Sequence, residues 1–86
     1  MKYFVYLLIT KTNSRTISYV GFTSDLKHRI KLHNNGKGAK FTRGRKWILA
    51  YKKCYKTKSE ALKNEYLLKK SYKKRSEIKN NFLLNK

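Results

Sequence analysis

The chain has 86 residues, the size of one small domain, which leaves no room for a second domain or a large cofactor pocket. Its 23 Lys and Arg residues face only four acidic residues, and the net charge of +19 makes nucleic acid the expected partner. No long apolar run or signal-like segment favours the rival, an acidic membrane surface. The lone Cys54 excludes an internal disulfide and a cysteine-based zinc site, so we expect a cytoplasmic protein.

Two apolar runs at the start of the chain predict a β-hairpin. Residues 3–9 are aromatic or aliphatic throughout, without alternation, which is typical of a central strand buried on both faces. A polar, turn-forming segment at 11–15 separates them from a second run at 17–22, so we expect the two strands to pair antiparallel. This pairing would bring the region of Tyr6 close to Tyr19.

A capped helix is predicted directly after the second strand. Ser24 or Thr23 can accept a hydrogen bond from the amides of the first turn, and Asp25 suits the positive end of the helix dipole. The Asn-Gly pair at 35–36 supplies the stop.

One face of this helix carries chemically versatile side chains. At about 100° per residue, Leu26, Ile30 and His33 share this face. Arg29 lies beside them, one turn before His33, so both point back toward Tyr19. A hydroxyl, a guanidinium and an imidazole suit a phosphate more than a core. A solvated Arg29 and a packed His33 fit the same spacing.

A basic loop at residues 34–46 contains three glycines and five cations. The predicted nucleic-acid contacts are Lys37, Lys40, Arg43, Arg45 and Lys46. Because glycine lets backbone amides approach phosphate oxygens, the loop could act as a backbone clamp. A merely solvated basic loop is the alternative.

The remaining chain predicts a third strand and two helices. The strand comprises Trp47 to Tyr51, extended by residues 54 and 55. Thr57-Lys58-Ser59-Glu60 is a capping box that opens a helix through about residue 70. A basic helix follows over 72–86, with apolar side chains at 78, 82 and 83 spaced to dock it. We therefore expect one α+β domain over residues 1–86.

One carboxylate stands within an apolar stripe of the first of these two helices. The stripe, within about 60° on a helical projection, consists of Ala61, Glu65, Leu68 and Tyr72. Burying a lone carboxylate costs several kcal/mol unless a cation pairs with it. The partner of Glu65 is then either a lysine or arginine, or a divalent metal ion held for catalysis.

These motifs resemble the GIY-YIG nuclease family, and the resemblance covers residues 2 to about 80. The second signature is present as Tyr19-Val20-Gly21. The first is degenerate, Phe4-Val5-Tyr6, which keeps the tyrosine and loses the glycine. Segments 19–23, 33–39 and 43–47 are similar to those of small stand-alone bacterial members and of the nuclease domain of the eukaryotic structure-specific endonuclease.

Three further positions carry the resemblance. Arg29 stands ten residues after Tyr19 and four before His33, matching the family's Arg-x-x-x-His pattern. Glu65 lies in the late helix, where the family places its metal ligand. The resemblance implies a three-stranded antiparallel sheet flanked by helices, and hydrolysis of phosphodiester bonds with one divalent metal.

Residue roles follow from the same resemblance. Glu65 would bind one Mg²⁺ or Mn²⁺ ion, and Arg29 would stabilise charge on the scissile phosphate. Tyr19 or Tyr6 would orient or deprotonate the attacking water, and His33 would position a tyrosine or the phosphate. These five residues are the predicted catalytic set.

The chain departs from the family pattern at Phe22. Some members carry a lysine there, directly after the second motif, where it could lower the pKa of a tyrosine. Lys40 from the basic loop is the candidate replacement.

Three functions are compatible with these patterns. The first is a metal-dependent endonuclease acting on DNA, with a role in repair or recombination of structured DNA; DNA is preferred to RNA as the partner, and the choice between them stays open. The second is a nucleic-acid-binding module without catalysis, and the third is a structural basic protein that coats nucleic acid. Glu65 separates the first from the others. A protein partner or a homodimer stays open.

Overall fold

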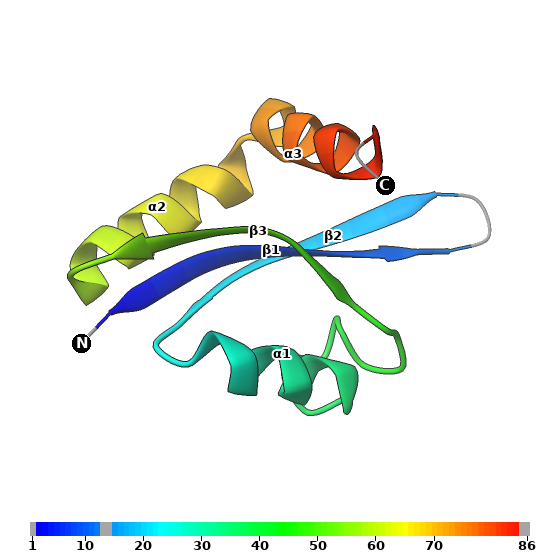
Figure 1. Cartoon of the computed structure of the whole chain (residues 1–86), viewed down its shortest axis with the longest axis horizontal. Coiled ribbons are helices and arrows are strands. Elements are labelled where there is room, and N and C mark those ends of the chain that lie inside the picture. Colours follow the sequence, from blue (N-terminus) through cyan, green and yellow to red (C-terminus); the bar gives the residue numbers. More distant parts are fainter. Residues whose placement is uncertain (1, 13–14, 85–86) are drawn as a thin grey trace.

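The computed structural model describes residues 2–12 and 15–84 (Figure 1). In chain order the elements are β1 (Tyr3–Lys11), β2 (Thr16–Thr23), α1 (Leu26–Asn34), β3 (Ile48–Tyr55), α2 (Lys58–Lys70) and α3 (Tyr72–Leu84). The predicted α+β class and the order of the elements are confirmed. Part of the predicted turn, residues 13–14, and the end of the predicted last helix, 85–86, lie outside the described residues.

The sheet is antiparallel with strand order β2-β1-β3, so β1 is central. Neighbouring side chains of a strand point to opposite faces, yet Leu7 and Leu8 are both fully buried. This confirms the prediction from the continuous apolar run that both faces of β1 are covered. In the hairpin register Tyr6 lies opposite Gly21, and Leu8 lies opposite Tyr19.

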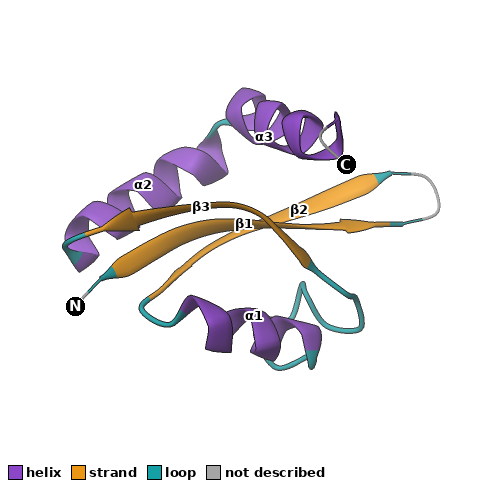
Figure 2. Cartoon of the chain, viewed as in Figure 1, coloured by secondary structure: helices purple, strands orange, loops and turns teal. Residues whose placement is uncertain are grey.

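Helices cover the two faces of the sheet unequally (Figures 1 and 2). On one face, α2 and α3 pack over the side of β1 that presents Val5, Leu7 and Ile9. On the other face, α1 packs over the side that presents Tyr6 and Leu8. The alternation along β1 therefore divides the core into two clusters.

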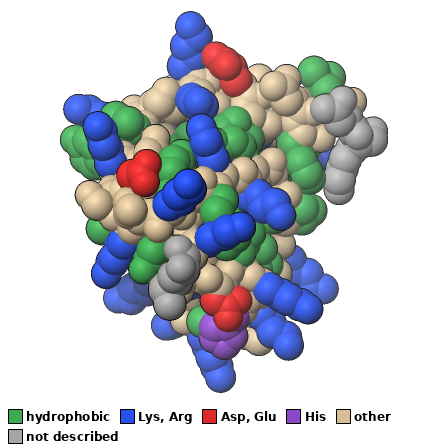
Figure 3. All heavy atoms as spheres, turned by 60° about the vertical axis from the view of Figure 1, so that its left-hand side comes forward, with side chains coloured by type: hydrophobic (Ala, Val, Ile, Leu, Met, Phe, Trp, Pro, Cys, Tyr) green, Lys and Arg blue, Asp and Glu red, His purple; other side chains and the backbone are tan. Residues whose placement is uncertain are grey.

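Figure 3 shows one face of the molecule, over which Lys and Arg side chains are spread with few acidic side chains between them. Within 2–12 and 15–84, no helix is both long and apolar enough to cross a membrane.

The start of α1 differs from the prediction. Asp25, rather than Ser24 or Thr23, is the N-cap, because its side chain accepts a hydrogen bond from the backbone N–H of His28 at 3.2 Å. The hydroxyl of Thr23 accepts from the backbone N–H of Asp25 at 3.1 Å and so shapes the preceding turn. Ser24 is exposed. Three adjacent capping residues made the exact cap ambiguous in the sequence.

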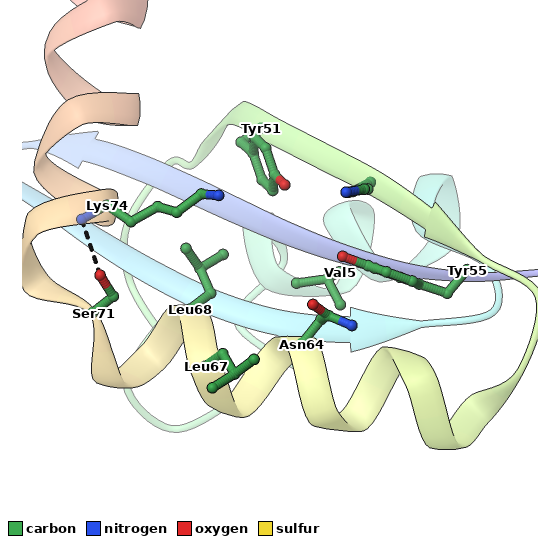
Figure 4. A pocket seen from close by; sticks show the side chains of 9 residues that line it. Val5, Tyr51, Tyr55, Asn64, Leu67, Leu68, Ser71 and Lys74 are labelled. Atoms are coloured by element: carbon green, nitrogen blue, oxygen red, sulfur yellow. Dashed lines mark hydrogen bonds between the residues drawn. The ribbon is translucent and has the colours of Figure 1, made fainter.

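Two further predictions are corrected. Trp47 precedes β3, which begins at Ile48, because the tryptophan is held by loop contacts instead of strand pairing. Tyr72 does not continue the apolar stripe of α2 and is 74% exposed. Helix α2 ends before Ser71, and α3 then runs in a new direction (Figure 4). The hydroxyl of Ser71 accepts a hydrogen bond from the backbone N–H of Lys74 in the first turn of α3.

Candidate active site

A chain of buried hydrogen bonds joins β1, α1 and the basic loop. The hydroxyl of Tyr6 lies 2.8 Å from Nε2 of His33, and Nδ1 of His33 lies 2.9 Å from Oγ1 of Thr42. The side chains of these three residues are almost completely buried. The amphipathic spacing of α1 placed His33 on the inner face correctly.

The direction of these hydrogen bonds follows from Thr42. Its hydroxyl donates its one proton to the carbonyl of Ala39 at 2.9 Å, so it can only accept from His33. Nδ1 of His33 therefore carries the proton, and in the neutral imidazole Nε2 is the acceptor. Tyr6 donates its hydroxyl proton to that acceptor, which fixes the phenol as a donor toward the imidazole.

Burial and charge keep both members of this pair neutral. Burial, with a smaller effect of the Arg29 charge, lowers the pKa of His33 below its usual value. Burial is also the main reason why the pKa of Tyr6 is raised, and the nearby Tyr19 and Glu65 raise it further, while Arg29 lowers it. At neutral pH the site therefore holds a protonated phenol against an unprotonated imidazole nitrogen.

Gly21 makes room for the Tyr6 phenol. A Cβ atom at Gly21 would lie 2.6 Å from Cζ of Tyr6, which no real contact allows. The two residues are partners across the β1–β2 pair. The glycine of the second signature thus lets the first tyrosine lie across β2 and reach His33.

Tyr19 contacts the same imidazole from β2. Its ring meets the His33 ring edge-on, with centroids 5.0 Å apart. It also packs against Phe41, with centroids 6.1 Å apart and the planes inclined by 21°, and edge-on against Trp47 at 6.4 Å. The predicted proximity of the two tyrosines is confirmed, since both of them touch His33.

The basic loop is anchored at both ends. Asn34 at the end of α1 accepts a hydrogen bond from the backbone N–H of Trp47 at 2.6 Å and donates to its carbonyl at 3.3 Å. The indole N–H of Trp47 donates to the carbonyl of Thr42 at 3.0 Å. Gly38 packs directly on the His33 ring, where a Cβ would lie 2.7 Å from Cγ. The backbone at Gly38 therefore supports the imidazole.

The five predicted nucleic-acid-binding cations of this loop are all exposed: Lys37, Lys40, Arg43, Arg45 and Lys46. Their side chains are thus accessible to a polyanion. Phe22, at the position of the family lysine, packs on the apolar cluster beneath α2. The cation that lowers the pKa of Tyr6 is Arg29 from α1, not a residue of the loop.

Arg29 and Glu65 bring opposite charges to Tyr6 from different helices. Arg29 acts electrostatically on both Tyr6 and His33, while Glu65 acts on Tyr6. Among the five predicted catalytic residues, Tyr6 and Tyr19 both contact His33. Arg29 and Glu65 are related to Tyr6 through their charges. Arg29 lies on α1 and Glu65 on α2, and these two helices cover opposite faces of the sheet.

Glu65 pairs with a lysine, which is one of the two kinds of partner expected for a carboxylate in an apolar stripe. Its side chain is 16% exposed, and Oε2 lies 3.6 Å from Nζ of Lys69, one turn later on α2. The lysine is 53% exposed, so this ion pair is long and solvated, the kind that contributes little to stability. Because Lys69 is exposed, its side chain can adopt another rotamer and leave the Glu65 carboxylate free to bind another cation.

The donor set around Glu65 suits one kind of metal. Among the described residues, no group of three or more His, Cys, Asp or Glu side chains could hold an ion. A single partly buried carboxylate fits Mg²⁺ or Mn²⁺, which take their other ligands from water and substrate phosphate oxygens. It does not fit zinc, which needs several protein ligands.

A hollow between α2 and β3 lies apart from these residues (Figure 4). Val5, Tyr51, Tyr55 and Leu68 are among its lining side chains, and none of the five predicted catalytic residues is. We assign it no chemical role.

Two residues of the site escaped sequence reasoning. Thr42 orients His33, and Phe41 packs on Tyr19, yet both lie in a loop where the sequence showed only charge and glycine. A lone threonine in a basic loop carries no pattern that predicts burial. The run Phe41-Thr42 between cations was the one available sign.

Comparison with known proteins agrees with this arrangement. The family model of the GIY-YIG catalytic domain matches residues 2–80.

A UPF0213 protein of Staphylococcus epidermidis is 46% identical over 79 residues, covering 91% of this chain and 92% of the relative. The UPF0213 protein YazA of Bacillus subtilis is 42% identical over 77 residues, covering 88% and 75%. The solution NMR structure of a UPF0213 protein from Bacillus halodurans is 40% identical, with a TM-score of 0.51 over 90% of this chain and 80% of that chain. The chain therefore belongs to the GIY-YIG family.

Proposed function

We propose that this protein is a divalent-metal-dependent endonuclease that hydrolyses phosphodiester bonds in DNA. One observation carries the proposal: the Tyr6 phenol donates to an unprotonated imidazole nitrogen while a guanidinium and a carboxylate act on the same phenol. Membership of the family supports it. A packed core would not need a buried phenol hydrogen-bonded to an imidazole and influenced by charges of both signs.

The Tyr6–His33 pair supplies the base for attack by water. As water attacks phosphorus, its proton passes to the Tyr6 oxygen, and the Tyr6 proton passes to Nε2 of His33. The bond from phosphorus to the leaving oxygen then breaks. Burial and, to a smaller extent, Arg29 lower the pKa of His33. When a substrate phosphate binds near Arg29, its negative charge offsets the effect of this cation and raises the pKa of His33, so the imidazole becomes a better proton acceptor.

Tyr19 positions the attacking water or the phosphate in this scheme. Its ring lies against the imidazole, next to the exposed loop, while the hydroxyl of Tyr6 is already engaged by His33. The proposal thus divides the roles that the sequence left open between the two tyrosines.

Arg29 holds a non-bridging phosphate oxygen as charge develops. A positioned donor in this role is typically worth about 3–4 kcal/mol of transition-state stabilisation, or roughly 100- to 1000-fold in rate. Together with burial, its charge lowers the pKa of His33, which supports a role of the guanidinium beside this imidazole.

Glu65 is the residue that would hold the metal. A bound Mg²⁺ or Mn²⁺ ion supplies Lewis acidity toward the phosphate and the leaving oxygen. To hold such an ion the carboxylate would give up its pair with Lys69, which would cost little because that lysine is solvated. The exposed loop cations would track the DNA backbone.

A non-catalytic nucleic-acid-binding module is the second candidate. It is favoured by the net charge of +19 and by the phenylalanine at position 22, where some family members carry a lysine.

Cleavage with substitutions separates the two candidates. Purified protein is incubated with Mg²⁺ or Mn²⁺ and duplex, flap, junction or single-stranded DNA. We expect nicking by the wild type, and a loss of at least about 100-fold for Glu65→Gln and Arg29→Ala with binding largely retained. Glu77→Gln, which changes an exposed glutamate on α3, is the matched control and should cut normally.

Other outcomes have defined meanings. Equal cleavage by the wild type and both site variants would identify a contaminant. Binding without cleavage on every substrate, with either metal, would favour the non-catalytic module.

A further inference from the structure

Phe41 is an exposed aromatic side chain beside the site. It is 53% exposed, although the next residue, Thr42, is completely buried. The hydrogen bonds of Thr42 to His33 and Ala39 fix this part of the loop, so Phe41 is held in its outward position. An aromatic ring kept exposed at a fixed position next to reacting groups is a candidate contact surface.

The ring of Phe41 has three planar neighbours, and one of them, the Trp47 ring, lies 6.1 Å away between centroids with the planes inclined by 43°. The Phe41 ring is also stacked on Tyr19, with centroids 6.1 Å apart and planes inclined by 21°. The guanidinium carbon of Arg45 lies 5.5 Å from its centroid. The same surface thus offers an aromatic face, the Tyr19 phenol that packs on both Phe41 and His33, and a cation that can reach a phosphate.

We propose that Phe41 and Arg45 form a stacking subsite for an unpaired nucleobase next to the scissile phosphate. This inference rests on the proposed function and deepens it by naming the substrate class: DNA with a single-stranded or unpaired nucleotide at the cleavage position. The base replaces Arg45 over the ring, and the displaced guanidinium pairs with the adjacent phosphate.

The requirement for an unpaired base has a geometric reason. In a duplex both faces of each base are covered by neighbouring bases, and only edges and phosphates are accessible. An aromatic side chain can therefore stack only on a base that has left the duplex or was never in it. Stacking uses the face that all bases share, so the subsite selects structure and not sequence.

Position within the site supports this assignment. Because Phe41 packs on Tyr19, and Tyr19 packs on His33, a base on the exposed part of the Phe41 ring would be adjacent to the phosphate that meets Tyr6 and His33. A second exposed aromatic residue with an arginine over it, Tyr72 with Arg75 at 5.9 Å, lies on α3, on the other face of the sheet. It provides a matched control with the same chemistry away from the site.

Binding without metal tests the proposal, because no cleavage is needed. The probe is a short oligothymidylate carrying one 2-aminopurine, whose fluorescence falls when it stacks. We expect Phe41→Ala to weaken binding of this single strand about tenfold and to abolish the quenching, while duplex affinity stays within about twofold. Phe41→Tyr should retain both the affinity and the quenching.

The control and the contrary results are distinct. Tyr72→Ala should bind like the wild type. Equal weakening by Phe41→Ala and Tyr72→Ala, or equal loss on single strand and duplex, would overturn the proposal. A failure of every metal-dependent cleavage assay would remove the nuclease and leave this binding result standing, so the two proposals fail separately.

Discussion

The imidazole side of the site and its carboxylate side differ in how firmly they are held. On the imidazole side, Tyr6, His33 and Thr42 are buried and joined by hydrogen bonds of 2.8 and 2.9 Å. On the carboxylate side, Glu65 has one ion pair of 3.6 Å with a lysine that is more than half exposed. The first side is fixed before substrate arrives, and the second can exchange its partner.

This difference matches the two tasks of the proposed reaction. Proton transfer needs donor and acceptor at a set distance, and a buried, fully paired network provides it. Metal exchange needs a carboxylate whose competing cation leaves easily, and a solvated lysine satisfies this. We expect substitutions on the imidazole side to affect folding and activity together, and those on the carboxylate side to affect activity almost alone.

The largest effect is expected for Gly21→Ala. The new methyl group would overlap the Tyr6 ring, and overpacking of this kind costs about 2–3 kcal/mol. The displaced phenol would lose His33, so cleavage should fall about 100-fold or more. Chemical denaturation and nicking assays measure the two effects. Ser18→Ala, on the same strand, is the control, and a fully stable and active Gly21→Ala would show that Tyr6 does not depend on this gap.

Thr42→Val tests the far end of the network. Valine keeps the shape of threonine but cannot accept from His33, which leaves a buried N–H unpaired at a cost of about 1–2 kcal/mol. The urea midpoint reports this loss. Thr42→Ser retains the hydroxyl and should recover most of the stability. If serine and valine were equally destabilising, the methyl group rather than the hydrogen bond would be the important feature.

The pKa of His33 predicts how stability depends on pH. Because this pKa is lowered in the folded state, the unfolded chain binds more protons as the pH falls below about 6.5. The stabilisation is complete above that pH and is lost toward the folded pKa, with a slope of up to about 1.4 kcal/mol per pH unit. Denaturation at a series of pH values between about 7.5 and about 5 measures this loss of stability. His33→Gln should flatten the slope, whereas His28→Gln, at an exposed histidine of the same helix, should keep it.

The smallest effect is expected for Lys69→Met on the carboxylate side. Removal of the competing cation should lower the metal concentration for half-maximal cleavage about twofold, with a stability change below about 0.5 kcal/mol. A metal titration of the cleavage rate measures this shift. Lys63→Met removes the same charge from α2 and should leave the metal requirement unchanged. A higher metal requirement in Lys69→Met would mean that the lysine helps to hold the site.

Several parts of the site could be predicted because they depend on local order. The four-residue interval between Arg29 and His33 sets them one helical turn apart, and the hairpin places Tyr6 near Tyr19. Glu65 was noticeable because it interrupts an apolar stripe. Phe41 and Thr42 were not, since their importance comes from contacts made after the loop closes over α1.

The sequence by itself determined the elements, their order and the class of fold, because strand and helix periods and capping residues act within a few neighbouring positions. It did not determine which of three neighbouring residues caps α1, or that Tyr72 turns outward at a break after Ser71. Only the tertiary structure decided the proton direction in the Tyr6–His33–Thr42 chain, because that direction depends on residues 27 and 9 positions apart meeting in a buried space.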